Sequence, residues 1–503
     1  MKKYDYVIIG AGIGGLTVAS LLAKSGKSVC IVEGNKVLGG YAHTLKKGKY
    51  SFCHEVQYLM GCQSDGPMIR FFKQIGIAND IKFNELNQKA FDLVSFDNLK
   101  VGIPHGLGSF EKEIIGMYLK YTKQIKKYFN VIETIFNTSD AYEKILETND
   151  VLLHPIKHRS IIKYKNYTLH DFFEELKLPQ ELRAVLAGQA GNLCASPKQV
   201  SLLMHSAMQV AYCKSAHFPK KGMEFVVNKI AEKITKNKNN KIITDCLVKK
   251  INCNKDRIIS IETVKGTIFG DNFISNIDPK QTYNLIDDRR LSCKLHKKFN
   301  YDYTNSAFTI YLGLKNVNLK KYGFGKMNIW HHSTFDIDKE FRDEIKKDDF
   351  SHPWLFISTP SMLTEKGIVC PKGHHTMEIL TFVDYDYFKT LYDKDKNKFE
   401  YLKNHIYNHI LDIIDQHYLP NIRKYIDEKI VHTPIDIEKL LHSPKGNVYG
   451  CSLTPDNYSL GRINSNTYFE NMHFVGAASS YPGVMGVTIG GMDLFKKLSS
   501  ENN

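Results

Sequence analysis

The chain has 503 residues, of which 43% are hydrophobic and 24% charged, and it carries a formal net charge of +15. This composition is that of a globular protein with room for two or three domains, and it excludes a small disulfide-stapled scaffold. No run reaches about 18 consecutive apolar residues, so no membrane-spanning helix is expected. The ten cysteines are scattered singly, which indicates free thiols in a reducing compartment.

The positive charge is spread along the chain in patches such as 123–127 and 229–241. A solvated basic surface is the simpler interpretation, and attraction to an anionic membrane or acyl-carrier surface is the sharper one. No nucleic-acid-binding motif accompanies the charge, so nucleic acid is not an expected partner. Because residues 1–5 run into a strand without a signal peptide, we expect a cytoplasmic protein, with peripheral membrane contact left open.

The first 33 residues predict a βαβ unit. Residues 6–10 form a short apolar run that ends in glycine, residues 16–25 have helical spacing, and residues 28–33 predict the next strand. Such a unit opens a dinucleotide-binding domain when glycines occupy its first turn.

That turn carries Gly10, Gly12, Gly14 and Gly15, which satisfy the dinucleotide-binding fingerprint. Bare backbone there lets a pyrophosphate approach the N-terminus of the helix and its positive dipole end. Glu33 lies 23 positions after Gly10, where a carboxylate accepts hydrogen bonds from a ribose diol. A glycine turn that binds nothing is the weaker interpretation, because strand, helix and acid occur together.

A second glycine pair, Gly39 and Gly40, follows Glu33 by six residues. In flavoproteins such a pair lets the chain pass close to the FAD phosphates, and NAD domains usually lack it. On its own the pair also fits an ordinary loop.

The remaining elements alternate between helical and strand-rich regions. Residues 109–136 and 169–213 predict helices, 222–234 another helix, and 241–276 a meander of short strands. Strands of a second sheet are expected at 306–314, 326–329, 354–359 and 376–383, followed by helices within 398–425. Residues 472–498 predict a strand, a glycine-rich turn and a helix.

Segments in order along the whole chain carry a family resemblance: Gly39-Gly-Tyr-Ala-His-Thr44, 58–61, 191–192, His205, 218–222, 276–279, 443–450, 474–477 and Tyr481-Pro-Gly-Val-Met-Gly486. They resemble retinol saturase and plant carotenoid isomerase, which are relatives of bacterial phytoene desaturase. The resemblance implies an α/β fold, in which an FAD-binding Rossmann-like domain of the glutathione-reductase and amine-oxidase type is joined to a mixed α+β substrate domain.

The resemblance also assigns cofactor contacts outside the first 40 residues. It places the flavin beside Gly476, Gly483, Met485, Gly486 and Val487, with the last helix pointing its N-terminus at the pyrimidine end of the ring. Backbone N–H groups and the helix dipole would stabilise a reduced, anionic flavin there.

One further contact comes from the meander, where Val248 resembles the position whose backbone meets adenine. The resemblance assigns the FAD-binding domain to residues 1–75, 220–290 and 445–503. The substrate domain would comprise 76–219 and 291–444.

The family motif changes at one place. Relatives usually have Phe-Asp-x-Gly where this chain has Phe52-Cys53-His54-Glu55, so an ionisable pair replaces a small residue near the flavin. His54 and Glu55 are therefore candidate catalytic residues, and a structural hydrogen-bonded pair is the equal alternative. Burial beside an apolar ligand should raise the pKa of Glu55 toward neutrality.

Other polar groups give weaker signals. The pairs His331-His332 and His374-His375 place neighbouring side chains on opposite faces of a strand, and no further ligand stands at metal-binding spacing. We predict no metal. No nucleophile elbow is present, so hydrolase chemistry is not supported.

The sequence therefore predicts an FAD-dependent oxidoreductase that acts on carbon–carbon bonds of an elongated apolar substrate, such as a polyene, carotenoid, retinoid or polyunsaturated acyl chain. Desaturation, saturation and cis–trans isomerisation all stay open. A flavin amine oxidase is one alternative, although Tyr41 stands where that group usually has arginine. A non-catalytic escort of prenylated proteins, similar to GDP-dissociation inhibitors, is the other.

Overall fold

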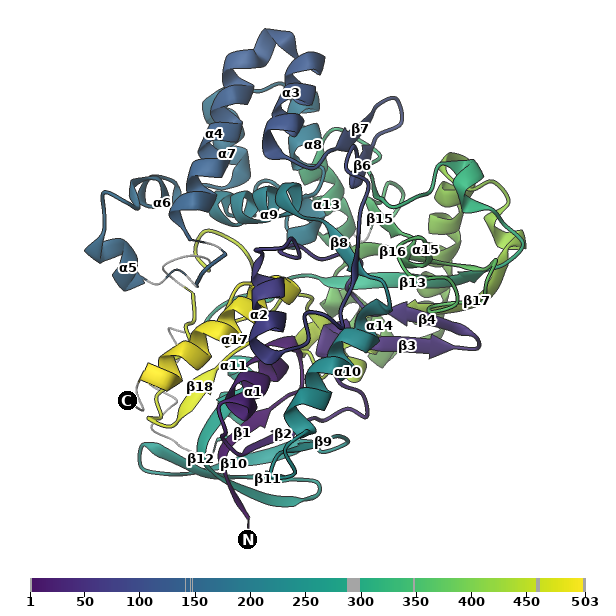
Figure 1. The fold of residues 1–503 in the computed structure, drawn as a ribbon. Helices are drawn as coiled ribbons and strands as arrows, with labels where there is room; N and C mark the ends of the chain where they lie inside the picture. The colour runs from purple at the N-terminus through teal and green to yellow at the C-terminus, as the bar shows by residue number, and fades with distance from the viewer. Residues whose placement is uncertain are drawn as a thin grey trace.

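The computed structural model describes residues 2–140, 142–144, 146, 148–286, 299–346, 349–457 and 462–500. Within these residues the strands form two seven-stranded sheets and two small two-stranded sheets. The first large sheet lies at the lower end of the molecule in Figure 1, the second lies on the right, and a helical lobe lies at the top. The expected domain boundary between residues 290 and 291 falls outside the described residues.

The strands and helices have the following bounds. The strands are β1 Lys3–Ile9, β2 Val29–Val32, β3 Thr44–Lys47, β4 Tyr50–Cys53, β5 Phe83–Glu85, β6 Asp92–Ser95, β7 Lys100–Ile103, β8 His217–Pro219, β9 Lys241–Ile243, β10 Val248–Asn254, β11 Arg257–Thr263, β12 Gly266–Ser275, β13 Ser306–Leu314, β14 Asn328–His331, β15 Leu355–Ser358, β16 His375–Val383, β17 Ile426–His432 and β18 Met472–Phe474. The α-helices are α1 Ile13–Lys24, α2 Pro67–Ile75, α3 Leu107–Met117, α4 Thr122–Thr138, α5 Thr148–Leu153, α6 Arg159–Tyr164, α7 Leu169–Leu176, α8 Gln180–Ala187, α9 Leu202–Lys214, α10 Gly222–Thr235, α11 Pro279–Asn284, α13 Ile337–Lys346, α14 Tyr385–Lys394, α15 Lys396–His417, α16 Pro434–Leu441 and α17 Gly483–Ser500.

The first sheet has the order β10-β11-β12-β1-β2-β9, and β18 pairs with β12. Its parallel register pairs Ile9 with both Val32 and Ser275, and Ser275 with Phe474. The carboxyl ends of β1, β2, β12 and β18 therefore lie level with one another. Loops that follow these four strands meet at one edge of the sheet, which is where open α/β sheets bind ligands.

Helix α1 covers this sheet together with α10 and α17 (Figure 1). Ten of its twelve residues are buried, because it lies against both neighbouring helices as well as the sheet. The approach of α17 is close: a Cβ added at Gly491 would lie 2.8 Å from Cγ2 of Thr17. The small residue thus lets the last helix dock against the first and brings the two helix N-termini to the same region.

The second sheet has the order β17-β13-β16-β15-β14-β6-β7. Its strand β13, which lies next to the edge strand β17, is buried along its entire length. Phe308, Ile310 and Leu312 pack into the hydrophobic core that also contains helix α15. Because side chains alternate along a strand, Thr309 and Tyr311 point to the other face, where they meet the segment that follows β4.

The helical lobe comprises α3 to α9. In α4 the buried residues Ile125, Tyr128, Phe129, Ile132 and Ile135 recur three and four positions apart, as expected for a helix with one face in a core. Helix α9 is buried almost throughout. The rest of the helical lobe packs on one side of it, and residues on its other side line an internal cavity of ligand size.

Several sequence expectations need correction in detail. The strand expected at 326–329 is β14, which runs from Asn328 to His331. The helix expected within 398–425 ends at His417, and strand β17 starts at Ile426. That strand has partly exposed polar residues and no long apolar run, so its periodicity is weak. Strand β6 and the edge strand β7 were not predicted either.

No helix among the described residues has both the length and the apolar character required to span a bilayer.

A substitution at Gly191 tests the packing between the helical lobe and the second sheet. A Cβ at this position would lie 2.6 Å from the ring of Trp330 and 2.9 Å from Trp354. We expect Gly191→Ala to lower the free energy of unfolding by about 1–3 kcal/mol through overpacking. Gly116→Ala is the matched control, because no atom lies within 4 Å of its added Cβ inside α3.

The control should raise stability by about 0.5–1 kcal/mol, since alanine favours the helix. Denaturant unfolding of the two variants measures both effects. Equal stability of the two variants would contradict the packing described.

Candidate functional site

The glycine loop after β1 lies at the sheet edge, and its glycine positions leave little room for a Cβ atom. A Cβ added at Gly12 would lie 2.7 Å from Nδ2 of Asn276, and one at Gly15 would lie 2.4 Å from the carbonyl oxygen of Gly10. Asn276 follows β12 and accepts a hydrogen bond from the N–H of Gly15 at 2.9 Å. The loop that follows β12 therefore constrains the conformation of the glycine loop.

Glu33 ties the glycine loop to the end of β2. Its carboxylate accepts hydrogen bonds from the N–H of Ala11 at 2.7 Å and from the N–H of Asn35 at 2.8 Å. Glu33 also lines the cavity described below, so remaining lone pairs of its oxygens face a ligand.

The second glycine pair lies directly against the first loop. Gly39 has a φ of +108°, which favours glycine, and its N–H donates to the carbonyl oxygen of Ala11 at 2.9 Å. A Cβ at Gly40 would lie 3.3 Å from Cα of Gly12. The two glycine segments are separate in the sequence, but together they form one surface of backbone without side chains.

A cavity of about 630 Å³ begins at this surface and extends between the lobes. Most of the cofactor residues expected from the sequence line it: Gly10, Gly12, Gly14, Glu33, Gly39, Gly40, Val248, Gly476, Gly483, Met485 and Val487. Gly15 and Gly486 are not among the lining residues. Both instead permit close backbone packing, since a Cβ at Gly486 would lie 2.4 Å from the carbonyl oxygen of Tyr481.

The N-termini of α1 and α17 both open toward the cavity. Gly12 is the N-cap of α1 and has no side-chain cap, and no acidic residue stands in the first turn. At α17 the residues Pro482, Gly483 and Val484 line the cavity. The first backbone N–H groups of a helix have no intrahelical partner, so both ends, apart from the Gly15 N–H that donates to Asn276, can offer hydrogen-bond donors and positive partial charge to an anionic ligand.

The far part of the cavity has apolar walls. Its lining includes Val56, Leu59, Met60, Leu193, Met204, Met208, Tyr212 and Tyr449. Methionine side chains adapt to irregular ligands, and a mostly apolar chamber with few polar groups is typical of a small-molecule site. The helical lobe contributes Leu193, Met204, Met208 and Tyr212 to this chamber, and the segment after β4 and the loop at Tyr449 contribute the rest, so the helical lobe does not build it alone.

Glu55 lies in the cavity wall beside the second glycine segment, and its N–H donates to the carbonyl oxygen of Tyr41 at 3.2 Å. Its carboxyl oxygen accepts hydrogen bonds from the hydroxyls of Thr309 at 3.1 Å and Tyr311 at 3.3 Å. Burial raises the pKa of Glu55 to about 8, although both hydrogen bonds favour the charged form. As expected from the sequence, this carboxyl is poised near neutrality.

His54 does not line the cavity, although it adjoins Glu55. Its Nδ1 lies 4.0 Å from Oε1 of Glu55, and neither ring nitrogen has a hydrogen-bond partner. Its ring stacks on His43 with 4.8 Å between centroids and lies 5.4 Å from the ring of His432. Burial and these two imidazoles hold the pKa of His54 well below its usual range, so this ring is neutral.

A second buried carboxyl adjoins this cluster. Glu378 on β16 accepts hydrogen bonds from the N–H of Cys53 at 3.2 Å and from Nε2 of Gln57 at 3.3 Å. Burial raises its pKa well above the ordinary value, and the nearby Glu55 raises it further. Glu378 was not predicted from the sequence, because it lies within an apolar strand that is far from Glu55 along the chain.

A buried polar network also reaches the cavity wall. The hydroxyl of Tyr58 donates to Asp92 at 2.9 Å and accepts from Nδ2 of Asn192 at 2.8 Å. Asp92 accepts further hydrogen bonds from Trp330, Asn328 and Gln189. Tyr58 and Asn192 belong to the segments that carry the family resemblance, but Asp92 stands on a strand that the sequence did not predict.

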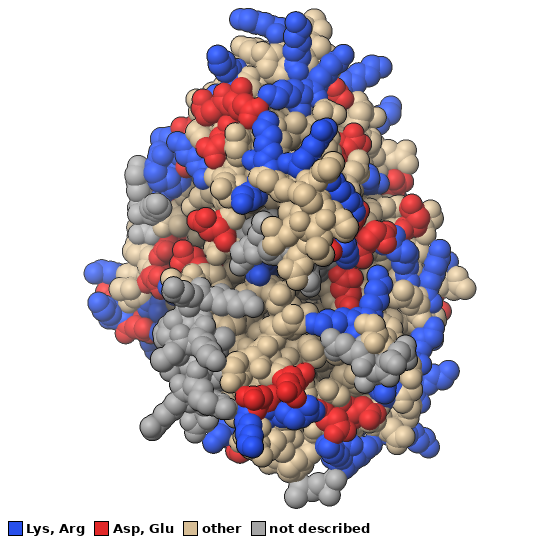
Figure 2. Space-filling view, turned by 90° about the vertical axis from the view of Figure 1, so that its left-hand side faces the viewer, with Lys and Arg blue, Asp and Glu red and all other residues tan. Residues whose placement is uncertain are grey.

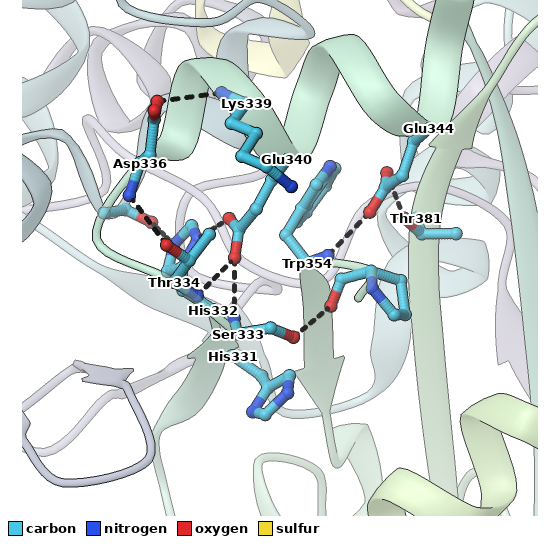
Figure 3. Close-up of polar contacts among 12 residues, drawn as sticks. His331, His332, Ser333, Thr334, Asp336, Lys339, Glu340, Glu344, Trp354 and Thr381 are labelled. Atoms are coloured by element: carbon cyan, nitrogen blue, oxygen red, sulfur yellow. Dashed lines mark hydrogen bonds and ion pairs between the residues drawn. The ribbon is translucent and has the colours of Figure 1, made fainter. Parts of the chain in front are cut away.

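The histidine pairs have structural partners. His331 ends β14 and His332 follows it, and the two side chains point in different directions (Figure 3). His331 Nδ1 lies 2.9 Å from the hydroxyl of Tyr418, and His332 Nδ1 lies 2.8 Å from Glu340 on α13. Among the described residues no group of three His, Cys, Asp or Glu could hold a metal ion.

This arrangement defines a two-lobed dinucleotide-binding protein in which the glycine edge of a Rossmann-type sheet opens into an apolar chamber. Residues 8–75 match the family model of the NAD(P)-binding Rossmann-like domain. Along 98% of its length the chain is 24% identical to the all-trans-retinol 13,14-reductase of Danio rerio, of which it covers 85%. It is 23% identical to the 4,4'-diaponeurosporene oxygenase of Staphylococcus aureus, with 98% of both chains covered.

These likenesses confirm the resemblance to retinol saturase and carotenoid desaturase-like oxidoreductases, and they show that the chain is an oxidoreductase. Among solved structures, putrescine oxidase bound to putrescine superposes with a TM-score of 0.67 at 13% identity, with 99% of both chains covered. This last comparison confirms the expected fold class.

The raised pKa of Glu55 makes stability depend on pH. The pKa is about 8 in the folded protein and near the ordinary 4.5 in the unfolded chain, so the folded state holds an extra proton between these values. The stability from this group is complete below pH 4.5 and is lost as the pH rises through 8. We expect the free energy of unfolding of the wild type to fall faster over this interval than that of Glu55→Gln, by up to about 1.4 kcal/mol per pH unit.

Urea unfolding at a series of pH values measures this difference. Glu400→Gln, at an exposed position on α15, is the control and should follow the wild type. Parallel profiles of wild type and Glu55→Gln would contradict the raised pKa.

Proposed function

We propose that this protein is an FAD-dependent oxidoreductase that acts on a carbon–carbon bond of an elongated apolar substrate, such as a polyene or an unsaturated acyl chain. The observation that carries the proposal is the continuous cavity. At one end it has the bare glycine surface and two free helix N-termini, and at the other it has apolar walls. The named activities of the two full-length relatives, on a retinol and on a carotenoid, support the substrate class.

The residues present fit FAD. A Cβ at Gly12 or Gly14 would lie 2.7 or 2.8 Å from the side chain of Asn276, so these positions stay bare. The helix N-termini suit phosphate groups, and Glu33 suits a ribose diol. Gly476, Gly483, Met485 and Val487 would hold the ring end, and Val248 would meet the adenine. Bound there, FAD would supply hydride exchange with the substrate carbon.

We assign proton transfer to Glu55. At neutral pH a carboxyl with a pKa of about 8 is mostly protonated, so Glu55 begins as a proton donor. Donation suits saturation or isomerisation of a double bond better than desaturation. The hydroxyls of Thr309 and Tyr311 donate hydrogen bonds that orient the carboxyl and stabilise the negative charge that develops on it. The neutral His54 would limit the charge beside the carboxyl.

The apolar walls would bind the substrate by removing hydrocarbon surface from water, which contributes about 25 cal/mol per Å². They would also exclude water from the reacting carbons. The polar group that Tyr58 and Asn192 present would orient the chain within the chamber.

The first test concerns the cofactor. We expect the purified wild type to be yellow and to release FAD, without a covalent tether, on denaturation. Gly12→Val should lose the flavin absorbance, because its side chain would clash with Asn276 and occupy the phosphate position. Gly108→Ala, with no atom within 4 Å of its Cβ, should retain it. A colourless wild type that stays unchanged with added FAD would overturn the proposal and favour a non-catalytic escort.

The second test concerns Glu55. Glu55→Gln keeps size and hydrogen bonding but cannot donate a proton, so it should bind FAD normally and lose turnover by about 10² to 10⁴. Wild-type turnover in the donating direction should fall as the pH rises above 8, because the donor form disappears. The assay incubates the protein with total lipid extract, with and without dithionite, and follows double bonds by mass spectrometry.

If Glu55→Gln turns over substrate at the wild-type rate, Glu55 is structural. If the wild type oxidises amines and leaves all double bonds unchanged, the carbon–nitrogen alternative replaces the proposal.

A further inference from the structure

The helical lobe carries an exposed apolar projection that the fold does not cover. It comprises the end of α5 and the turn into α6, residues 152–157, all of which are exposed. Leu152, Leu153 and Ile156 have exposed fractions of 68%, 73% and 88%. Scattered single apolar residues are normal on a protein surface, but three within five positions form a patch that calls for a partner.

Beyond Asp150 in the first turn of α5, which pairs with Lys144, the charge on this segment is of one sign. Residues 151–167 contain Lys157, Arg159, Lys163 and Lys165 and no aspartate or glutamate. Lys157 pairs with Asp140 at 2.7 Å, whereas Arg159 and Lys165 have no acidic partner within the described part of the chain.

The projection lies at the outer edge of the molecule. Helices α5 and α6 extend to the left in Figure 1, and Figure 2 shows that face with lysine and arginine side chains around uncharged surface. Apolar side chains at a convex tip with a cationic rim match a fluid layer with anionic headgroups. A protein partner would need a pocket shaped to the tip, whereas acyl chains yield to it.

We propose that the α5–α6 projection docks the protein on an anionic lipid bilayer, with Leu152, Leu153 and Ile156 inserted and with Arg159 and Lys165 at the headgroups. The inference does not depend on the proposed function.

The chain on either side of the projection contacts elements that line the cavity. The N–H of Leu146 donates to the hydroxyl of Tyr481 at 3.1 Å, and Tyr481 directly precedes the cavity-lining Pro482. Helix α6 also packs against α9, which contributes Met204 and Met208 to the apolar chamber. Docking would therefore hold the chamber close to the bilayer, and the use of this proximity to take up an apolar substrate rests on the proposed function.

Cosedimentation of the full chain with vesicles tests the docking without any substrate. Vesicles of phosphatidylcholine with phosphatidylglycerol should bind the wild type at low ionic strength, and salt should weaken the binding. The triple variant Leu152→Ser, Leu153→Ser, Ile156→Ser should bind at least about tenfold more weakly, because the inserted hydrocarbon is lost. The double variant Arg159→Gln, Lys165→Gln should lose about tenfold on the anionic vesicles, with less effect on vesicles of phosphatidylcholine alone.

Tyr401→Ser is the matched control, since Tyr401 is 73% exposed on α15 in the other lobe. It should bind as the wild type does. All substituted side chains are exposed or partly exposed, so thermal unfolding and flavin content should stay unchanged and will show that each variant is folded.

Failure of the wild type to bind anionic vesicles at low salt would overturn the proposal, as would a triple variant that binds normally. Binding to an acidic acyl-carrier protein in place of vesicles would also overturn it. None of these outcomes changes the flavin content or the effect of Glu55→Gln, so failure of docking is distinguishable from failure of the proposed function.

Discussion

The parallel register of the first sheet fixes the position of everything that surrounds the glycine surface. Ile9, Val32, Ser275 and Phe474 end their strands at one level, so the chain leaves the sheet four times at the same edge. These exits place the glycine loop, Glu33, Asn276 and Gly476 within reach of one ligand. A shift of two residues in any strand would separate these groups by about 7 Å, because each strand residue advances the chain by about 3.3 Å.

The chemistry depends on a second constraint, which is the dry contact between the two lobes. The short segment from Cys53 to Tyr58 leaves the two-stranded sheet β3–β4 and passes along β13 and β16. Here Glu55 has hydroxyl partners and no cation close enough to hold it charged, so desolvation decides its pKa. Glu378 and the imidazoles around His54 stay uncharged for the same reason, and the segment can lie buried without a net charge.

Function is therefore divided among three parts of the fold. The first sheet supplies anion-binding backbone, the second sheet supplies the partners of Glu55, and the helical lobe closes the apolar chamber with α9. The helical lobe also bears the uncovered tip at residues 152–157, which is followed by Arg159 and Lys165, two cations without an acidic partner among the described residues. A lobe that both closes a chamber for an apolar ligand and contacts lipid would join binding and supply in one element.

The sequence alone determined the elements whose chemistry is local. Gly10 to Gly15, Glu33 and the Gly39-Gly40 pair were recognisable because a phosphate-binding turn needs bare backbone at fixed spacing from an acid and a helix. Strand β13 and the last helix were predicted from the pattern of their apolar residues, which is also a local signal. Ordered segments of family likeness carried the prediction to the C-terminal turn at Gly483.

Only the tertiary structure decided which distant residues meet. Thr309, Tyr311 and Glu378 have no local signal, since a polar residue in an apolar strand reveals neither its face nor its partner. Asp92 gathers four donors, which are Tyr58, Gln189, Asn328 and Trp330. Strands β6 and β17 were missed because their short or mixed patterns carry little periodicity. His54 was predicted as a partner of Glu55, but burial among His43 and His432 made it a neutral ring outside the cavity, because side-chain environment depends on packing that spacing cannot encode.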